Sequence, residues 1–188
     1  MSQQPTTREL PAFVTGTWTI DPVHSDVSFA VRHMMVSKVR GHFGTFEGKI
    51  VTGADPLASS ATASIDLSSI NTNNAQRDAH IRSADFFEVE KYPTMTYRST
   101  GVAEAGDGYW VDGELSLHGV TRPVQLKVDL NGFGPDPFGG IRAGFSATGE
   151  INRRDFGIDI SMPLDGGGVV VGDKVQLLLE IEAVLDQE

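Results

Sequence analysis

The sequence contains no cysteine and is short of positive charge. None of its 188 residues is cysteine, which excludes disulfides, thiolate nucleophiles and zinc–thiolate sites. The 25 acidic and 15 basic residues give a formal net charge of -10. Nucleic acids and anionic lipid heads are both bound by basic surfaces. We therefore expect no nucleic-acid partner, and we interpret the acidic charge as an aid to solubility.

Long hydrophobic runs are also missing. No apolar stretch approaches the roughly 20 residues that cross a bilayer as a helix, so we expect no membrane insertion. The first thirteen residues, MSQQPTTRELPAF, have neither the basic start nor the apolar stretch of a secretory signal, and we expect a cytoplasmic protein. Residues 1–15 are polar with two prolines, which predicts a flexible arm before a single domain over residues 16–186.

Alternation of apolar and polar residues dominates the chain from Trp18 onward. It is clearest over residues 124–130, where valine and leucine alternate with glutamine, lysine and aspartate. Similar runs, separated by turns rich in glycine, cover residues 43–50, 61–67, 110–117 and 175–181. Many short strands without intervening helices favour an antiparallel sandwich or barrel. A barrel of about eight strands is wide enough to hold one small ligand.

One segment lacks this alternation. Residues 74–88 contain neither glycine nor proline, and Asn74 is a candidate N-cap. We expect one helix there, packed against the barrel. Arg77 and His80 share one face of this helix. They would either cover the mouth of the barrel and contact a ligand, or belong to a helix that packs through its apolar residues.

Four ionisable residues lie among apolar ones near the start of the domain: Asp21, His24, Arg32 and His33. Buried polar groups need partners. In one interpretation these residues anchor a ligand head group, or His24 or His33 acts as a general base beside Asp21. In the other, Asp21 and His24 form an Asx-type turn, and Arg32 pairs with a carboxylate.

Patterns for metal and cofactor binding are absent. No two of the five histidines have the i, i+4 spacing of a helical zinc site. The sequence has no P-loop, no G-x-S-x-G and no G-x-G-x-x-G before a helix. Ser25 and His24 are adjacent, and adjacent residues of a strand face opposite ways. We therefore expect no metal, no cofactor and no enzymatic activity.

Phenylalanines occur in nearly every predicted element, where they would form either a solid core or the wall of a lumen.

Several short segments together carry a resemblance to a known family. They lie at residues 18–25 (WTIDPVHS), 39–43 (VRGHF), 77–87 (RDAHIRSADFF), 92–93 (YP), 113–124 (GELSLHGVTRPV), 152–157 (NRRDFG) and 171–175 (VGDKV). With these segments in the family's order, the chain resembles the YceI-like family of bacterial isoprenoid- and lipid-binding proteins from about Trp18 to Val184.

The resemblance implies an all-β fold, an extended eight-stranded antiparallel barrel of lipocalin-like type with the predicted helix laid against it. It also implies a long apolar tunnel for an amphipathic lipid: a polyisoprenoid, an isoprenoid quinone, a prenyl phosphate, or a fatty acid or amide. Such a protein would be a carrier, or a storage or stress protein. Two alternatives remain open, a hydrolase or isomerase that uses His24 or His33 with Asp21, and an interaction protein with a filled core.

We assign candidate residues on this basis. The apolar wall of the tunnel would include Phe29, Val31, Phe43, Leu117, Leu126 and Phe145. The end that binds the ligand's head group would include Arg32, His33, Arg77 and His80. The structural polar residues would be Asp21, His24, Arg154 and Asp155. Strand edges left open at a barrel seam would also allow a homodimer.

Overall fold

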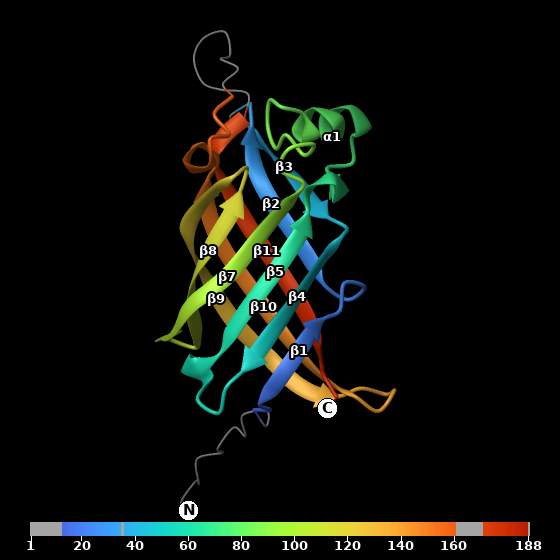
Figure 1. The fold of residues 1–188 in the computed structure, drawn as a ribbon, viewed down its shortest axis with the longest axis vertical. Helices are drawn as coiled ribbons and strands as arrows, with labels where there is room; N and C mark the ends of the chain where they lie inside the picture. The colour runs from blue at the N-terminus through green and yellow to red at the C-terminus, as the bar shows by residue number, and fades with distance from the viewer. Residues whose placement is uncertain (1–12, 35, 161–170, 188) are drawn as a thin grey trace, which may run out of the picture.

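The computed structural model describes residues 13–34, 36–160 and 171–187 (Figure 1). These residues form eleven strands, one α-helix and three short 3-10 helices. In chain order the elements are β1 (Gly16–Ile20), β2 (Asp26–His33), β3 (Ser37–Phe43), β4 (Phe46–Thr52), η1 (Pro56–Ala58), β5 (Ser60–Asp66), η2 (Leu67–Ser69), β6 (Ile70–Asn71), α1 (Ala75–Arg82), β7 (Thr94–Ala105), β8 (Gly108–Leu117), β9 (Val120–Pro135), β10 (Ile141–Asn152), η3 (Arg153–Phe156) and β11 (Val171–Leu185).

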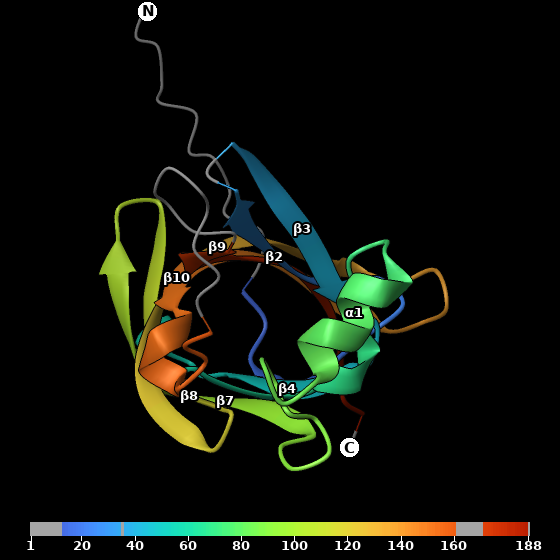
Figure 2. The ribbon, with the colours of Figure 1, turned by 90° about the horizontal axis from the view of Figure 1, so that it is seen from above.

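Eight of the strands close into an antiparallel barrel. The order around it is β1-β4-β5-β7-β8-β9-β10-β11, and β1 pairs again with β11 to complete the ring. Seen from one end, the strands surround a common axis (Figure 2). The predicted eight-stranded antiparallel barrel is therefore confirmed.

The three remaining strands extend the barrel at the end that carries α1. The long strand β11 pairs with β1 through residues 183–185 and with β2 over residues 171–180. Strand β3 pairs with β2, and β6 pairs with the last residues of β3. Residues 43–50, predicted as one strand, are thus divided between β3 and β4. The division arises because the Gly44 N–H donates to the Ser69 carbonyl and the Thr45 carbonyl accepts from the Asp66 N–H.

The buried apolar residues form two core clusters. Near α1, Leu67, Phe156 and Leu117 are buried within the main core cluster. Near the opposite end, Trp18 is fully buried with Ala183 in a second cluster. The functional candidate described below is a cavity whose wall shares residues with the main cluster, among them Ile20, Phe46 and Leu115.

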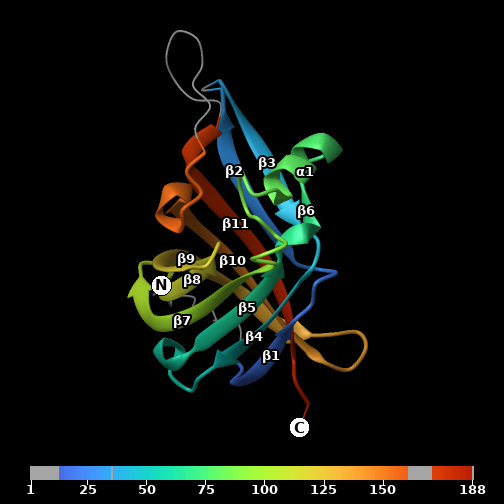
Figure 3. The same ribbon diagram turned by 45° about the horizontal axis from the view of Figure 1, so that its top comes forward.

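The helix α1 lies beside β3 and β6 at one end of the barrel (Figures 1 and 3). The side chain of Asn74 accepts from the Arg77 N–H and so caps its start, as predicted. The helix ends at Arg82, whereas the prediction extended to residue 88. The chain continues in turns because the Glu88 N–H bonds back to the Ser83 carbonyl and Glu88 itself has a left-handed φ of 51°.

The predicted N-terminal arm lies mostly outside the described residues, which begin at Phe13. Phe13 packs edge-to-face on Phe133, with ring centroids 5.4 Å apart. None of the helices in the described part of the chain has the length and hydrophobicity that crossing a bilayer requires.

Candidate functional site: an apolar cavity in the barrel

The barrel contains a partly open cavity of about 250 Å³, which is just below the range of about 300–1,000 Å³ for small-molecule sites. Its wall is built by aliphatic and aromatic side chains from strands around the ring, and Phe13 adds to it from the N-terminal side. The polar side chains in the wall carry only hydroxyl groups, from serine, threonine and tyrosine. Among the described residues that line it there is no aspartate, glutamate, histidine, lysine or arginine. The cavity therefore suits an uncharged, elongated apolar group.

Four of the six predicted wall residues line this cavity: Phe29, Phe43, Leu126 and Phe145. Val31 does not, because it lies farther along β2, where that strand pairs with β3 and β11 above the cavity. Leu117 does not line it either. It is 4% exposed and belongs to the packed core near Phe156 that fills the α1 end.

The four predicted head-group residues lie near the α1 end, and none of them lines the cavity. Arg77 donates from Nε to Thr72 Oγ1 at 2.8 Å and from Nη2 to the Thr72 carbonyl at 2.6 Å. His80 pairs with Asp85 at the surface. Their contact with a ligand head group stays a prediction.

Arg32 and His33 close the C-terminal end of β2, where Arg32 is exposed and His33 half-buried. None of the ion pairs between described residues includes Arg32, so the carboxylate partner that we considered for it is not found there. Asp21 and His24 lie before the N-terminal end of the same strand. The four residues that are close in sequence therefore form no single cluster.

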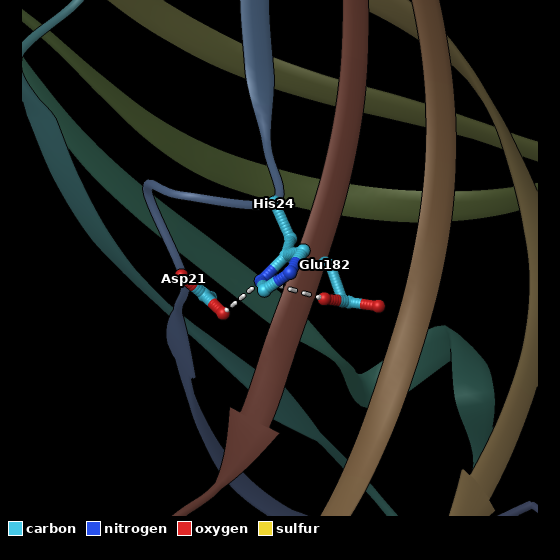
Figure 4. A group of neighbouring side chains, drawn as sticks. All are labelled: Asp21, His24 and Glu182. Atoms are coloured by element: carbon cyan, nitrogen blue, oxygen red, sulfur yellow. Dashed lines mark hydrogen bonds and ion pairs between the residues drawn. The ribbon is translucent and has the colours of Figure 1, made fainter. Parts of the chain in front are cut away.

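Asp21 and His24 belong to a polar network on the outer surface of the barrel (Figure 4). His24 Nδ1 lies 2.8 Å from Asp21 Oδ2 and 3.5 Å from Glu182 Oε2. Asp21 Oδ1 also accepts from the Val23 N–H at 2.9 Å, which is the Asx-type turn of the structural interpretation. The chain neighbours Ile20 and Ile181 point into the cavity, so Asp21 and Glu182 face away from it.

Arg142, which the sequence did not identify, joins this network from β10. Its guanidinium contacts three carboxylates, at 2.7 Å from Asp21, 2.7 Å from Asp136 and 2.9 Å from Glu182. The hydrogen bond from Arg142, followed by the one from His24, holds the pKa of Asp21 well below its usual range. The network fastens β1, β10 and β11 together.

The same geometry argues against chemistry at this network. Asp21, His24 and Glu182 present three atoms with the spacing of a metal site. However, Arg142 Nη1 lies within 2.9 Å of the same two carboxylate oxygens, so a cation already occupies their shared position. Because none of these residues lines the cavity, a general base here would not reach a ligand held inside the barrel.

A second polar group fixes η3 to the start of β11. Arg154, predicted as structural, donates from Nε to Asp173 at 2.8 Å. Asp155 contributes through its backbone carbonyl, which accepts from Arg122 Nε. A third member, Arg153, was not among the residues predicted from the sequence. It is buried and donates to the Ile158 carbonyl at 2.7 Å. Burial lowers the pKa of Arg153. This group has a structural role at the α1 end.

Comparison with known proteins agrees with this geometry. A family model described as a YceI-like domain matches residues 18–183. A UPF0312 protein of Vibrio cholerae serotype O1 is 42% identical over 139 residues, which are 73% of this chain and 74% of that protein. BcnA of Burkholderia cenocepacia shares the fold with a TM-score of 0.75 and 24% identity, covering 87% of this chain and 98% of BcnA.

A structure described as a polyisoprenoid binding domain from Saccharophagus degradans, implicated in plant cell wall breakdown, also shares the fold. Its TM-score is 0.65 at 20% identity, over 92% of this chain and all of that one. At this identity the likeness shows the fold alone. The family match, which extends over most of the chain, shows more: this chain belongs to the YceI-like family.

Proposed function

We propose that the protein binds a long-chain amphipathic lipid of the polyisoprenoid class inside the barrel, and that it acts as a carrier or store for that lipid. The uncharged wall of the cavity inside the barrel is the observation that carries this proposal. The Saccharophagus degradans domain, described as polyisoprenoid-binding, has the same fold and supports the choice of ligand class.

The apolar wall is sufficient to hold such a ligand without a charged anchor. Burial of each methylene contributes about 0.8 kcal/mol, so ten buried methylenes contribute about 8 kcal/mol before the costs of association and chain ordering. The polar end of the ligand then sets orientation and specificity more than affinity. This agrees with a wall whose polar side chains carry hydroxyl groups only.

The ligand's head group is constrained by the same wall. A phosphate or carboxylate buried without a cation would pay a large desolvation cost, and the described lining residues supply no cation. A prenyl phosphate or fatty acid would therefore have to keep its head outside the cavity. The head group of an isoprenoid quinone, a fatty amide or another neutral lipid meets no such cost.

The proposal is tested by native mass spectrometry of protein purified without detergent, followed by organic extraction and lipid analysis. We expect a bound mass that matches a prenyl lipid in the extract. After delipidation, addition of geranylgeraniol should restore that kind of complex and raise the unfolding temperature, because a ligand that binds only the folded state stabilises it. The proposal would be refuted if protein purified from its own host contained no bound lipid and added prenyl lipids left its unfolding temperature unchanged.

A further inference from the structure

The hydroxyl group of Tyr97 is an anomaly in the cavity wall. Among the described residues, only two buried side-chain nitrogen or oxygen atoms lack a hydrogen-bond partner, the Tyr97 hydroxyl and His118 Nε2. A buried hydroxyl without a partner destabilises the folded state, so native proteins rarely keep one without a reason. Tyr97 lies on β7 and its side chain lines the cavity. The hydroxyl that lacks a hydrogen-bond partner therefore belongs to a residue of the proposed ligand site.

The surrounding backbone accommodates this tyrosine specifically. A Cβ atom added to Gly113, on the adjacent strand β8, would lie 2.3 Å from the Tyr97 hydroxyl. The absence of a side chain at Gly113 thus leaves a recess that holds the hydroxyl against the wall. The pairing of β7 with β8 is also irregular between Ser99 and Gly101, and such bulges are common beside functional sites.

Tyr97 keeps its proton under all physiological conditions. Burial, with a smaller contribution from the charge of Asp112, raises the pKa of Tyr97 to about 12. The next inward residue of β7, Ser99, also lines the cavity, and its Oγ accepts from the Ala61 N–H at 2.8 Å. The Ser99 hydroxyl hydrogen remains available to another acceptor. Two neutral donors thus lie side by side in a wall whose described residues bear no charge.

We propose that Tyr97 donates a hydrogen bond to an acceptor oxygen of the bound lipid, so that the ligand's polar end lies inside the barrel beside β7 and β8. This bond requires the side chain to turn about its Cα–Cβ bond, so that the hydroxyl leaves the Gly113 recess and reaches the cavity. This inference rests on the proposed function and narrows it. The ligand is an uncharged lipid with a carbonyl, ether or hydroxyl oxygen, because this part of the wall offers donors but no cation.

The test compares two ligands of the same chain length, 2-pentadecanone and pentadecane. The first has a carbonyl group where the second has a methylene. Their affinities are measured by displacement of Nile red from delipidated protein. We expect Tyr97→Phe to weaken binding of the ketone about three- to tenfold, the effect of one net hydrogen bond, and to leave binding of the alkane unchanged. Tyr109→Phe is the matched control. Tyr109 also lines the cavity, and its hydroxyl is not one of the buried unpartnered atoms.

Two further measurements separate ligand recognition from a structural role. The unliganded Tyr97→Phe variant should unfold at the same temperature as the wild type or higher, since the lost hydroxyl makes no hydrogen bond in the protein. The carbonyl stretch of carbon-13-labelled 2-pentadecanone should lie at lower frequency in the wild type than in the variant, because a donated hydrogen bond weakens the C=O bond.

The outcomes distinguish this inference from the proposed function. Wild-type protein that binds neither compound overturns both. Wild-type protein that binds the ketone, with equal affinity and the same carbonyl frequency in Tyr97→Phe, overturns the role of Tyr97 alone.

Discussion

At the residue scale, Thr52 shows how one hydroxyl secures the barrel end opposite α1. Its Oγ1 accepts from Trp18 Nε1 at 2.8 Å and donates to the Val14 carbonyl at 2.8 Å. Trp18 is fully buried and Thr52 is 5% exposed, so water cannot replace either bond. The hydroxyl thereby attaches the segment before β1 to β4.

We expect Thr52→Val to lower the free energy of unfolding by about 1–3 kcal/mol, because the isosteric side chain leaves the buried Trp18 N–H unsatisfied. Urea unfolding followed by tryptophan fluorescence measures the change. Thr62→Val is the control, since Thr62 is exposed on β5; it should change stability by less than about 0.5 kcal/mol. Equal effects of the two variants would contradict this role for Thr52.

Asp21 makes the stability of the protein dependent on pH. Its pKa in the folded state is lowered, first by Arg142 and then by His24, whereas an unfolded aspartate titrates near about 3.9. The stabilisation is therefore fully present above that unfolded value and is lost as the pH falls toward the folded pKa. Asp21→Asn should be less stable than the wild type at pH 7, and the difference should shrink below about pH 4.

Chemical denaturation of both proteins from pH 3 to pH 7 measures this dependence. Asp107→Asn serves as control, because Asp107 is exposed in the turn between β7 and β8 and none of the ion pairs between described residues includes it. A difference between wild type and Asp21→Asn that stays constant over the whole range would contradict the assignment.

The sequence revealed only half of this network. The segment from Asp21 to His24 is a local turn, and local hydrogen bonding of aspartate to the backbone is readable from its neighbours in the chain. Arg142 lies 121 residues away from Asp21, and only the closure of β1 on β11 brings the two together. Arg32 and His33 were grouped with Asp21 for their proximity in sequence, yet an extended strand carries them to its far end.

At the scale of elements, α1 is held to the barrel by buried polar contacts more than by an apolar face. Asp78, which is 8% exposed, accepts from the backbone N–H and the hydroxyl of Thr72. Arg77 binds the same residue from the other side. Two consecutive side chains of α1, Arg77 and Asp78, thus hold the link between β6 and α1 in place.

We expect Asp78→Ala to cost about 1–3 kcal/mol of stability, because it leaves the buried N–H of Thr72 without an acceptor. Hydrogen exchange of the α1 amides should speed up more than that of β9, since α1 depends on this contact. Asp78→Asn keeps an acceptor oxygen at the same place and should lose much less protection. Unchanged exchange in Asp78→Ala would show that the apolar contacts alone anchor the helix.

The elements differ in how far the sequence predicts them. The run from Val124 to Leu130 alternates cleanly and lies in β9, where Val124 and Leu126 are buried. Strand β10 was not apparent, because its inward positions include small residues such as Ala143 and Ala147 and its register shifts after Gly144. The predicted length of α1 is too great because its end depends on Ser83, whose backbone is extended and whose N–H and hydroxyl both donate to the His80 carbonyl, and not on a proline or glycine.

At the scale of the whole molecule, the cavity is lined by inward-facing residues from strands all around the ring. Ala63 and Ala147 are small lining residues, whereas at the inward glycines Gly48 and Gly113 the side chains of Ile20 and Tyr97 fill the space that a Cβ would occupy. Near α1, large inward side chains such as Leu117 pack into the core. Periodicity shows which residues face inward, but only the register between strands determines which of them share a level. The position of the cavity could therefore not be predicted from the sequence.

The cavity can be filled by one substitution. Ala147 lines it from β10, opposite Leu179 and Val128 in the neighbouring strands. We expect Ala147→Phe to reduce lipid affinity at least about 100-fold, since losing four to five buried methylenes of ligand costs more than about 2.8 kcal/mol. Because the added ring occupies existing space, the stability of the unliganded protein should fall by less than the 1–3 kcal/mol that overpacking typically costs.

Thr148→Phe provides the matched control for this variant. Thr148 is the next residue of β10 and is exposed on the outer face of the barrel, so a phenylalanine there adds the same apolar surface without entering the cavity. Titration of the delipidated proteins with geranylgeraniol, followed by thermal unfolding, compares the three. Binding that survives in Ala147→Phe but is lost in Thr148→Phe would place the lipid on the outside of the sheet, because only the outer face is changed in the second variant.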